Sequence, residues 1–141
     1  MKRKIEFTVL GEPQGKGRPK FARRGKYVSV RTPEKTKAYE NAIQAAYLQQ
    51  YSNVGFPEGS QIELHIVAYF KIPKSTSKKK RATMLSGELR PTKKPDGDNI
   101  LKAVADALNG VAYKDDACVV KMEIEKYYGE PERIDVVLQE C

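Results

Sequence analysis

The chain has 141 residues, of which 40% are hydrophobic and 31% are charged, a composition typical of a folded protein rather than a disordered one. Its 26 Lys and Arg outnumber its 18 Asp and Glu, and the net charge of +8 favours a polyanionic partner. No apolar run is long enough to span a bilayer or to act as a secretion signal, so we expect a cytoplasmic protein with no membrane partner.

The N-terminal segments predict a strand, a loop and a second, short strand. Residues 4–10 alternate apolar and polar side chains, which predicts a strand with one solvent-facing side. Residues 11–26 are rich in Gly, Pro and basic residues, so we expect a loop there. Residues 27–30 favour a short strand.

A helix is predicted to start at Thr32 and to run to about Tyr51. Thr32 suits the N-cap, Pro33 suits the first helical position, and Glu34 suits the positive end of the helix dipole. The helical spacing assigns five residues to the inner face: Tyr39, Ala42, Ile43, Ala46 and Tyr47.

The middle of the chain predicts a long strand followed by a basic helix. After a loop over residues 53–60, residues 61–72 read as a strand. Residues 74–87 favour a short basic helix that ends at Gly87, and residues 88–97, which contain two prolines, are expected to be extended. Alternation along the strand places four side chains on one side of the pleat: Ile62, Leu64, Ile66 and Ala68.

The C-terminal third predicts one more helix and the last two strands. The helix covers residues 98–108, and the Asn-Gly pair that follows is its stop signal. Residues 118–127 and 134–138 read as strands joined by a hairpin turn over residues 129–132. This order of elements implies an α/β or α+β fold, with a mixed β-sheet and packed helices in a single domain over residues 1–141.

The chain has few residues for thiol or imidazole chemistry. Cys118 and Cys141 are too few for a disulfide framework or a zinc site, and we expect a buried core thiol and a free tail thiol, respectively. His65 is the only histidine, which argues against a histidine base or a histidine-rich metal site.

Positive charge is concentrated in two segments. Residues 11–31 carry seven basic residues against one acidic residue, and residues 71–94 carry nine against one. Clustering of this kind is typical of proteins that bind a polyanion. Solvated surface loops that merely aid solubility are the simpler alternative.

Carboxylates gather between residues 94 and 116 of this otherwise basic chain. Asp96 and Asp98 are two residues apart, so in an extended segment their side chains would share one side. Lys102 and Asp106 follow Asp98 at four-residue steps, which places all three near one helical face. Converging carboxylates repel one another, so a site that gathers them usually holds a cation or has a raised pKa.

Asp115 and Asp116 follow the predicted helix, at the start of the next strand. Folding the helix back on the sheet would bring this pair beside Asp96 and Asp98, where the oxygen ligands suit Mg²⁺, with Mn²⁺ able to substitute. Such a metal would polarise a phosphodiester and activate a water, and Lys102 would stabilise charge in the transition state.

Each of these residues also has a structural interpretation. Asp98 alone is explained by a helix N-cap, and the Asp115–Asp116 pair by a polar turn. Lys102 and Asp106 are explained by an exposed ion pair worth a few tenths of a kcal/mol. The residues by themselves leave both interpretations open.

The acidic segments also resemble a family signature. Residues 94–102, 106–110 and 115–120 read K-P-D-G-D-N-I-L-K, D-A-L-N-G and D-D-A-C-V-V, and residues 11–19 read G-E-P-Q-G-K-G-R-P. These motifs are similar to those of the RusA family of Holliday junction resolvases, with P-D-x-D-N-x-x-K, D-x-L and D-D-x-x-V in the same order. The basic stretch around residues 78–81 looks longer than in the shortest members of that family.

The resemblance implies a small homodimeric, Mg²⁺-dependent endonuclease that nicks four-way DNA junctions symmetrically in recombination and repair. By motif position, Asp96, Asp98 and Asp116 would bind the metal and Lys102 would be the catalytic lysine. Asp115 and Asn99 would support the site from outside the metal's own ligands. Proteins of this family are often encoded by phages or prophages.

A four-way junction has near-two-fold symmetry, so a dimer with two sites could cut opposing strands. The basic segments would then contact the DNA backbone, which positions the DNA without reading its sequence. The candidates for these contacts are Lys16, Arg18, Lys20, Arg23, Arg24, Lys78, Lys79, Lys80 and Arg81. Two other functions stay open: a non-catalytic DNA-binding module with structural carboxylates, and a metal-dependent hydrolase of small phosphoesters.

Overall fold

The computed structural model describes residues 3–17, 20–31, 33–52 and 55–141; within 20–31 it gives the backbone and, of the side chains, those of Arg23 and Lys26. The elements follow in chain order: β1 Lys4–Leu10, β2 Lys20–Arg24, β3 Tyr27–Arg31, α1 Glu34–Tyr51, β4 Ile62–Phe70, α2 Lys78–Leu85, α3 Gly97–Ala107, a 3-10 turn η1 Asp116–Cys118, β5 Val119–Tyr128 and β6 Arg133–Glu140.

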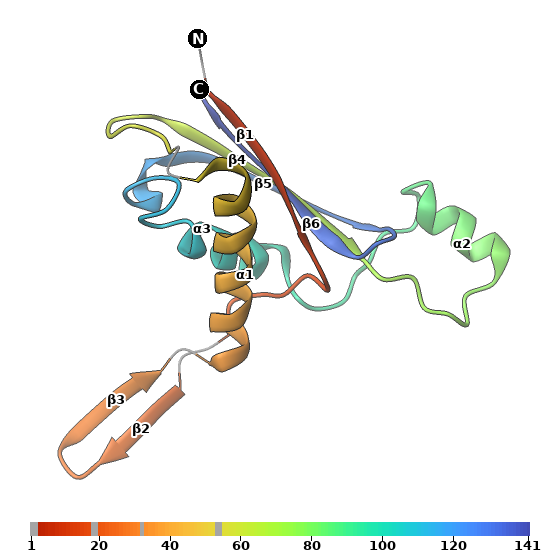
Figure 1. Ribbon diagram of the computed structural model, residues 1–141. Helices are drawn as coiled ribbons and strands as arrows, with labels where there is room; N and C mark the ends of the chain where they lie inside the picture. The colour runs from red at the N-terminus through yellow and green to blue at the C-terminus, as the bar shows by residue number, and fades with distance from the viewer. Residues whose placement is uncertain (1–2, 18–19, 32, 53–54) are drawn as a thin grey trace.

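Four strands form one mixed sheet in the order β1-β6-β4-β5, confirming the predicted fold class. The β4–β5 pair is parallel and the other pairs are antiparallel. Helices α1 and α3 lie against the sheet and against each other (Figure 1). Alternate residues of β1, β4 and β6 are buried beneath these helices, because one face of each strand is covered and the other is open.

The predicted hairpin between the last two strands is wrong. β5 and β6 follow each other in sequence, but β4 lies between them in the sheet. The turn after β5 crosses the end of β4, where the backbone N–H of Gly129 donates to the carbonyl of Phe70 at 3.0 Å. Burial explains this order: β6 hides Ile134, Val136 and Leu138 completely, which suits a central strand, whereas β5 is largely exposed, as an edge strand is.

The loop predicted over residues 11–26 is wrong in its second half. Strands β2 and β3 form a two-stranded hairpin that turns at Gly25, which has φ +60°, and the predicted short strand is confirmed as β3. The hairpin projects from the body beside the start of α1 (Figure 1). The Gly, Pro and basic residues of this segment favoured a loop. Strand β2 forms nevertheless, because its pairing partner β3 follows directly after the turn.

Helix α1 has the predicted extent, but its inner face differs at one position. Tyr39, Ile43 and Tyr47 are buried as predicted and Ala46 is half-buried, whereas Ala42 is exposed. A polar residue, Thr36, completes the buried face. The predicted cap, Thr32, lies outside the described residues, and Pro33 occupies the N-cap position without a side-chain hydrogen bond.

The other two helices also form where expected. In α2 the hydroxyl of Ser77 accepts a hydrogen bond from the backbone N–H of Lys80, and the helix lies at the margin of the molecule with only Met84 buried (Figure 1). Helix α3 starts at Gly97 with Asp96 as its N-cap residue, so the interpretation of Asp98 as the cap is wrong.

Both cysteines are free thiols. Cys118 is half-buried rather than fully buried, and Cys141 is exposed as predicted.

Candidate active site

Two segments far apart in the sequence meet at the start of α3. The backbone N–H of Lys16 donates to the carbonyl of Asn99 at 3.1 Å. A Cβ at Gly15 would lie 2.8 Å from the Cβ of Asn99, closer than real Cβ atoms come. Glycine at position 15 therefore permits the N-terminal loop to lie directly against α3.

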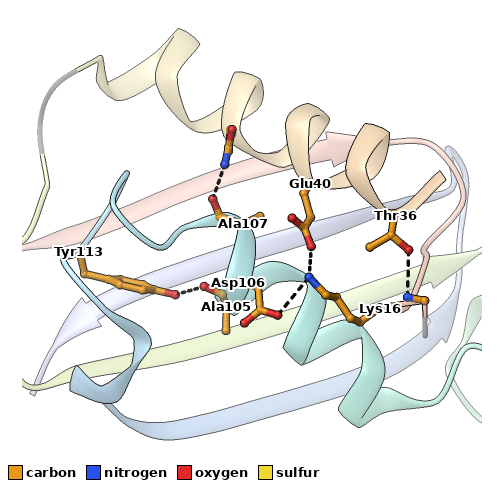
Figure 2. Close-up of polar contacts among 9 residues, drawn as sticks. Lys16, Thr36, Glu40, Ala105, Asp106, Ala107 and Tyr113 are labelled. Atoms are coloured by element: carbon orange, nitrogen blue, oxygen red, sulfur yellow. Dashed lines mark hydrogen bonds and ion pairs between the residues drawn. The ribbon is translucent and has the colours of Figure 1, made fainter. Parts of the chain in front are cut away.

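The same loop is also fixed to α1. The backbone N–H of Gly17 donates to the buried hydroxyl of Thr36 at 2.9 Å (Figure 2). A Cβ at Gly17 would lie only 2.6 Å from that hydroxyl oxygen, so a side chain there would break the contact. The backbone of Lys16 is thus bonded to α3 and that of the next residue, Gly17, to α1.

These contacts leave a cavity of about 550 Å³ between the loop, the start of α1 and the approach to α3. Asp96 and Asn99 of the predicted site contribute to one wall, and the N-terminal motif forms another. The lining residues are Glu12, Pro13, Gln14, Gly15, Lys16, Gly17, Pro33, Lys35, Thr36, Lys94, Pro95, Asp96 and Asn99. The cavity therefore joins the two motifs that the sequence singled out.

Lys16 lines the cavity, and its ammonium lies between two carboxylates from different helices. Its ammonium bonds the carboxylate of Glu40 on α1 and lies 3.2 Å from that of Asp106 on α3 (Figure 2). Burial acts to lower the pKa of Lys16, but the hydrogen bonds and charges of Glu40 and Asp106 outweigh it, and the pKa is raised. The ammonium thus has two internal partners, and its predicted contact with DNA stays a prediction.

The partner of Asp106 differs from the one that the sequence suggested. Helical spacing paired it with Lys102, four residues earlier, whereas the structure pairs it with Lys16. In the part of the chain that the structure describes, Lys102 forms no ion pair, and its side chain is exposed on α3. Its ammonium is accordingly available to an incoming anion.

Asp115 and Asp116 form a carboxyl pair on the turn η1. The backbone N–H of Asp116 donates to Oδ1 of Asn109 at 2.8 Å, which fixes the turn to the end of α3. A hydrogen bond between the two carboxyl groups raises the pKa of Asp116, and burial and the charges of Asp115 and Asp106 add to this effect. The ionised form of Asp116 is therefore disfavoured on this turn in the absence of a positive charge.

Tyr113 anchors the segment that leads to this pair. Its buried hydroxyl donates to the carbonyl of Ala105 at 2.7 Å (Figure 2). Burial raises the pKa of Tyr113, and the neighbouring carboxylates raise it further. The neutral phenol thus ties the acidic turn to α3.

The predicted site residues occupy one helix and the turn after it, but the structure does not gather all of them at one point. Asp96 lies at the start of α3 beside the cavity, Asp98 and Lys102 are exposed along the helix, and Asp116 lies on η1. The extended arrangement expected for Asp96 and Asp98 is absent, because the helix starts between them. Among the described residues, no three His, Cys, Asp or Glu side chains are grouped closely enough to hold a metal ion.

The donor chemistry nevertheless fits a hard divalent cation. Asp115 and Asp116 are adjacent carboxyl groups at the start of η1, and the pKa of Asp116 is raised by its neighbour Asp115, by burial and by the charge of Asp106; a bound cation would offset this negative charge.

Sequence reasoning missed Thr36 and Glu40 as parts of the site. Both lie on α1 and are four residues apart, so they share a side with the buried residues of that helix. Polar residues on an otherwise apolar helix face were the available signal.

The candidate DNA contacts lie mainly on the two projecting elements. Lys78, Lys79 and Lys80 are exposed on α2, and Arg81 forms an exposed ion pair with Glu130 at 2.6 Å. Arg23 is exposed on β2.

Three further predicted contacts have no described side chain. Lys20 and Arg24 belong to β2, whose description at these two positions covers only the backbone, and Arg18 lies outside the described residues.

Carboxylates on a helix and its following turn, flanked by basic extensions, are typical of proteins that act on phosphodiesters. Comparison with known proteins agrees: a family model described as "Endodeoxyribonuclease RusA" matches residues 11–139. The chain belongs to the RusA family of endodeoxyribonucleases, which confirms the resemblance seen in its motifs. It is also similar to the uncharacterized protein YqaN of Bacillus subtilis (strain 168), with 40% identity over 138 residues and 96% of each chain covered.

None of the helices in the described parts of the chain is both long enough and apolar enough to cross a membrane.

Proposed function

We propose that the protein is a Mg²⁺-dependent endonuclease that resolves four-way DNA junctions, as a homodimer that makes paired symmetric nicks in DNA recombination and repair. The observation that carries this proposal is the meeting of the two family motifs around one cavity, in a chain whose family membership extends over residues 11–139. Acidic groups beside this cavity and basic groups on the extensions supply the charges that such a reaction requires.

The proposed metal ligands are Asp96, Asp98 and Asp116. Bound there, Mg²⁺ would polarise the scissile phosphodiester and lower the pKa of an attacking water. The adjacency of Asp115 and Asp116 at the start of η1, with the pKa of Asp116 raised, supports a cation at that turn, because a bound cation would offset the concentrated negative charge.

The remaining groups act through charge and position. The exposed ammonium of Lys102 lies on the same helix as Asp98, one turn further on, where it can attract the scissile phosphate and offset charge developing on it. Asn99 fixes the N-terminal loop through its backbone carbonyl, so it positions the wall of the cavity. Asp115 caps η1 by accepting a hydrogen bond from the backbone N–H of Ala117, and in this way holds Asp116 in place.

Cleavage of a labelled four-way junction tests the proposal, with a linear duplex beside it and either Mg²⁺ or EDTA present. The wild type should nick the junction in pairs only with the metal, and Asp98→Asn should bind the junction without cutting it. Asp135→Asn is the matched control and should keep full activity, because Asp135 lies on β6, away from the proposed site, where its carboxylate bonds Thr8 of β1 and Arg133 of β6.

One observation favours the alternative of a non-catalytic DNA-binding module. Asp106, a residue of the family motif, is engaged in an internal ion pair with Lys16 and therefore has a structural role. Binding without cleavage under every metal condition would support that alternative. Release of phosphate from nucleotides, with junctions left intact, would instead indicate a small-molecule hydrolase.

A further inference from the structure

Strand β5 has an open edge. It pairs with β4 on one side, and within the described part of the chain no strand pairs with its other side. An open edge offers unpaired backbone groups to another strand, and folded proteins usually protect such edges. The question is what protects this one.

The C-terminal end of β5 is protected by its own chain. Arg90 donates a hydrogen bond from Nε to the carbonyl of Lys126 at 2.7 Å, and the ammonium of Lys126 bonds the carbonyl of Lys93 at 2.6 Å. Helix α2 also lies beside this end of the strand (Figure 1). The unprotected stretch is therefore the N-terminal part of the strand, residues 119–125, and its centre is Met122.

The bond to Arg90 also shows which backbone groups point outward. The N–H and C=O of one residue point to the same side of a strand, and the side alternates from residue to residue. Because the carbonyl of Lys126 points away from β4, Ile124 and Met122 also present their backbone groups at the open edge. A second strand can pair with them.

The side chains along this stretch are unusually apolar for an exposed edge. Two large apolar residues are exposed here: Val120 is 58% exposed and Met122 is 43% exposed. Lys121 lies between them and Glu123 follows Met122, so two opposite charges alternate with the apolar residues. Isolated apolar residues on a surface need no explanation, but two on an open edge favour pairing with another chain.

We propose that the open edge of β5 pairs antiparallel with β5 of a second copy, about a two-fold axis through Met122. This inference deepens the proposed function, since it names the surface that forms the proposed homodimer. In this register Met122 faces Met122 of the partner subunit, Val120 faces Ile124 of the partner subunit, and Lys121 faces Glu123 of the partner subunit. Apolar residues meet on one face of the joined sheet, and opposite charges meet on the other.

Neighbouring registers are less favourable. Moving the axis to Lys121 sets that ammonium against its own copy, and moving it to Glu123 does the same with two carboxylates. An axis through Ile124 places Glu123 opposite Glu125 of the partner subunit, which sets two carboxylates against each other. It also places Met122 opposite Lys126 of the partner subunit, whose backbone carbonyl already accepts a hydrogen bond from Arg90. The register through Met122 alone among these four avoids like charges.

The proposed interface lies next to the acidic helix. The start of α3 packs on β5, where a Cβ at Gly97 would lie 3.1 Å from a methyl carbon of Ile124. Two-fold pairing of β5 therefore places the two α3 helices, which carry Asp98 and Lys102, on the same face of one continuous sheet. Two sites related in this way match the symmetry of a four-way junction.

A charge swap tests the register in the full chain, with the dissociation constant of the dimer measured by sedimentation equilibrium. Lys121→Glu should weaken the dimer by about tenfold or more, because each copy then faces two like charges across the axis. The double variant Lys121→Glu with Glu123→Lys restores the opposite-charge pairs and should return the dissociation constant close to that of the wild type. A wild-type dimer that is indifferent to Lys121→Glu would overturn the proposal, as would a monomeric wild type.

Oxidative cross-linking is the second measurement, and it does not depend on the swap variant folding. In the proposed register the two Met122 Cα atoms lie about 5.5 Å apart, within the range for a disulfide. In a Cys141→Ser background, Met122→Cys should form a covalent dimer, whereas Glu125→Cys, on the same edge but far from the axis, should not. Equal cross-linking of both variants, or of neither, would contradict the register.

Junction cleavage by the same variants separates this inference from the proposed function. A dimer through β5 that cuts no DNA would refute the proposed function and leave the interface standing. Cleavage that continues while the β5 variants leave the dimer intact would refute the interface alone.

Discussion

Lys16 connects three segments that are distant in the sequence, and it does so with a single ammonium. The N-terminal loop carries the residue, α1 supplies Glu40 and α3 supplies Asp106. All three side chains are largely buried, with exposed fractions of 20%, 19% and 28%. Removing the cation would leave two carboxylates facing each other with little water to screen them.

Lys16→Met should therefore lower the free energy of unfolding by about 2 kcal/mol, since it leaves partly buried carboxylates without a partner. Denaturant titration measures this, and Lys37→Met, at an exposed position on α1, is the matched control. Adding Glu40→Gln to Lys16→Met should recover part of the loss. Equal stability of Lys16→Met and the control would show that the ion pairs contribute nothing.

Tyr39 makes stability depend on pH in the alkaline range. Burial raises the pKa of Tyr39 to about 12. The folded protein therefore keeps this proton above pH 10, where the unfolded chain releases it, so the contribution is full below about pH 10 and is lost as pH rises through 12. Comparing unfolding free energies at pH 9 and 11, Tyr39→Phe should remove about 1 kcal/mol of the decline seen in the wild type. An unchanged decline would exclude Tyr39 as its source.

At the residue scale the sequence identified the acidic candidates but not their surroundings. Asp96, Asp98, Asp116 and Lys102 stand out through spacing and charge, which are local properties. The pairing of Lys16 with Glu40 and Asp106 depends on how two helices pack, and no local pattern encodes that packing.

At the scale of elements, α2 exposes a cluster of positively charged side chains. Its N-terminal turn holds Lys78, Lys79 and Lys80, all exposed, and Met84 is its only buried residue. Basic residues at a helix N-terminus oppose the helix dipole, and the Ser77 cap offsets part of that penalty. Such an arrangement is easier to understand if the lysines meet a polyanion.

Replacing the three lysines of α2 with Ala should leave the fold intact and weaken binding to junction DNA. Each lost phosphate contact should reduce the slope of log affinity against log salt by about 1. Fluorescence anisotropy over a salt series measures the slope, with Lys37→Ala as a single-lysine control. A triple variant with the wild-type slope would place the DNA elsewhere.

Elements were largely predictable, because each depends on spacing along a short stretch. The extents of β1, α1, β4, α2 and α3 follow from alternation, helical period and capping residues. The hairpin β2–β3 and the separation of β5 from β6 were missed, because strand pairing depends on which faces are buried in the finished sheet.

At the scale of the whole molecule, a basic protein holds an acidic patch that needs a counter-charge. The carboxyl groups of Asp115 and Asp116 repel each other once both are ionised, and the Asp106 carboxylate adds to this repulsion. A cation bound by the folded state but not by the unfolded chain stabilises the fold by mass action.

Adding Mn²⁺ or Mg²⁺ should accordingly raise the melting temperature of the wild type by about 5 °C at saturating metal. Asp116→Asn should show a much smaller rise, whereas Asp135→Asn should respond like the wild type. Differential scanning calorimetry in EDTA and in metal provides the comparison, independently of any cleavage assay. A response unaffected by Asp116→Asn would place the cation elsewhere.

The pairing of β1 with β6 has a consequence for biosynthesis. These strands are joined along their whole length, from Lys4 opposite Gln139 to Leu10 opposite Arg133, and in the described chain β1 pairs with no other strand. A growing chain can therefore not complete its sheet until β6 has left the ribosome. Ile5, Phe7 and Val9, all buried in the finished fold, belong to a strand with no pairing partner until then, so this part of the core can form only after residues 133–140 have been synthesised.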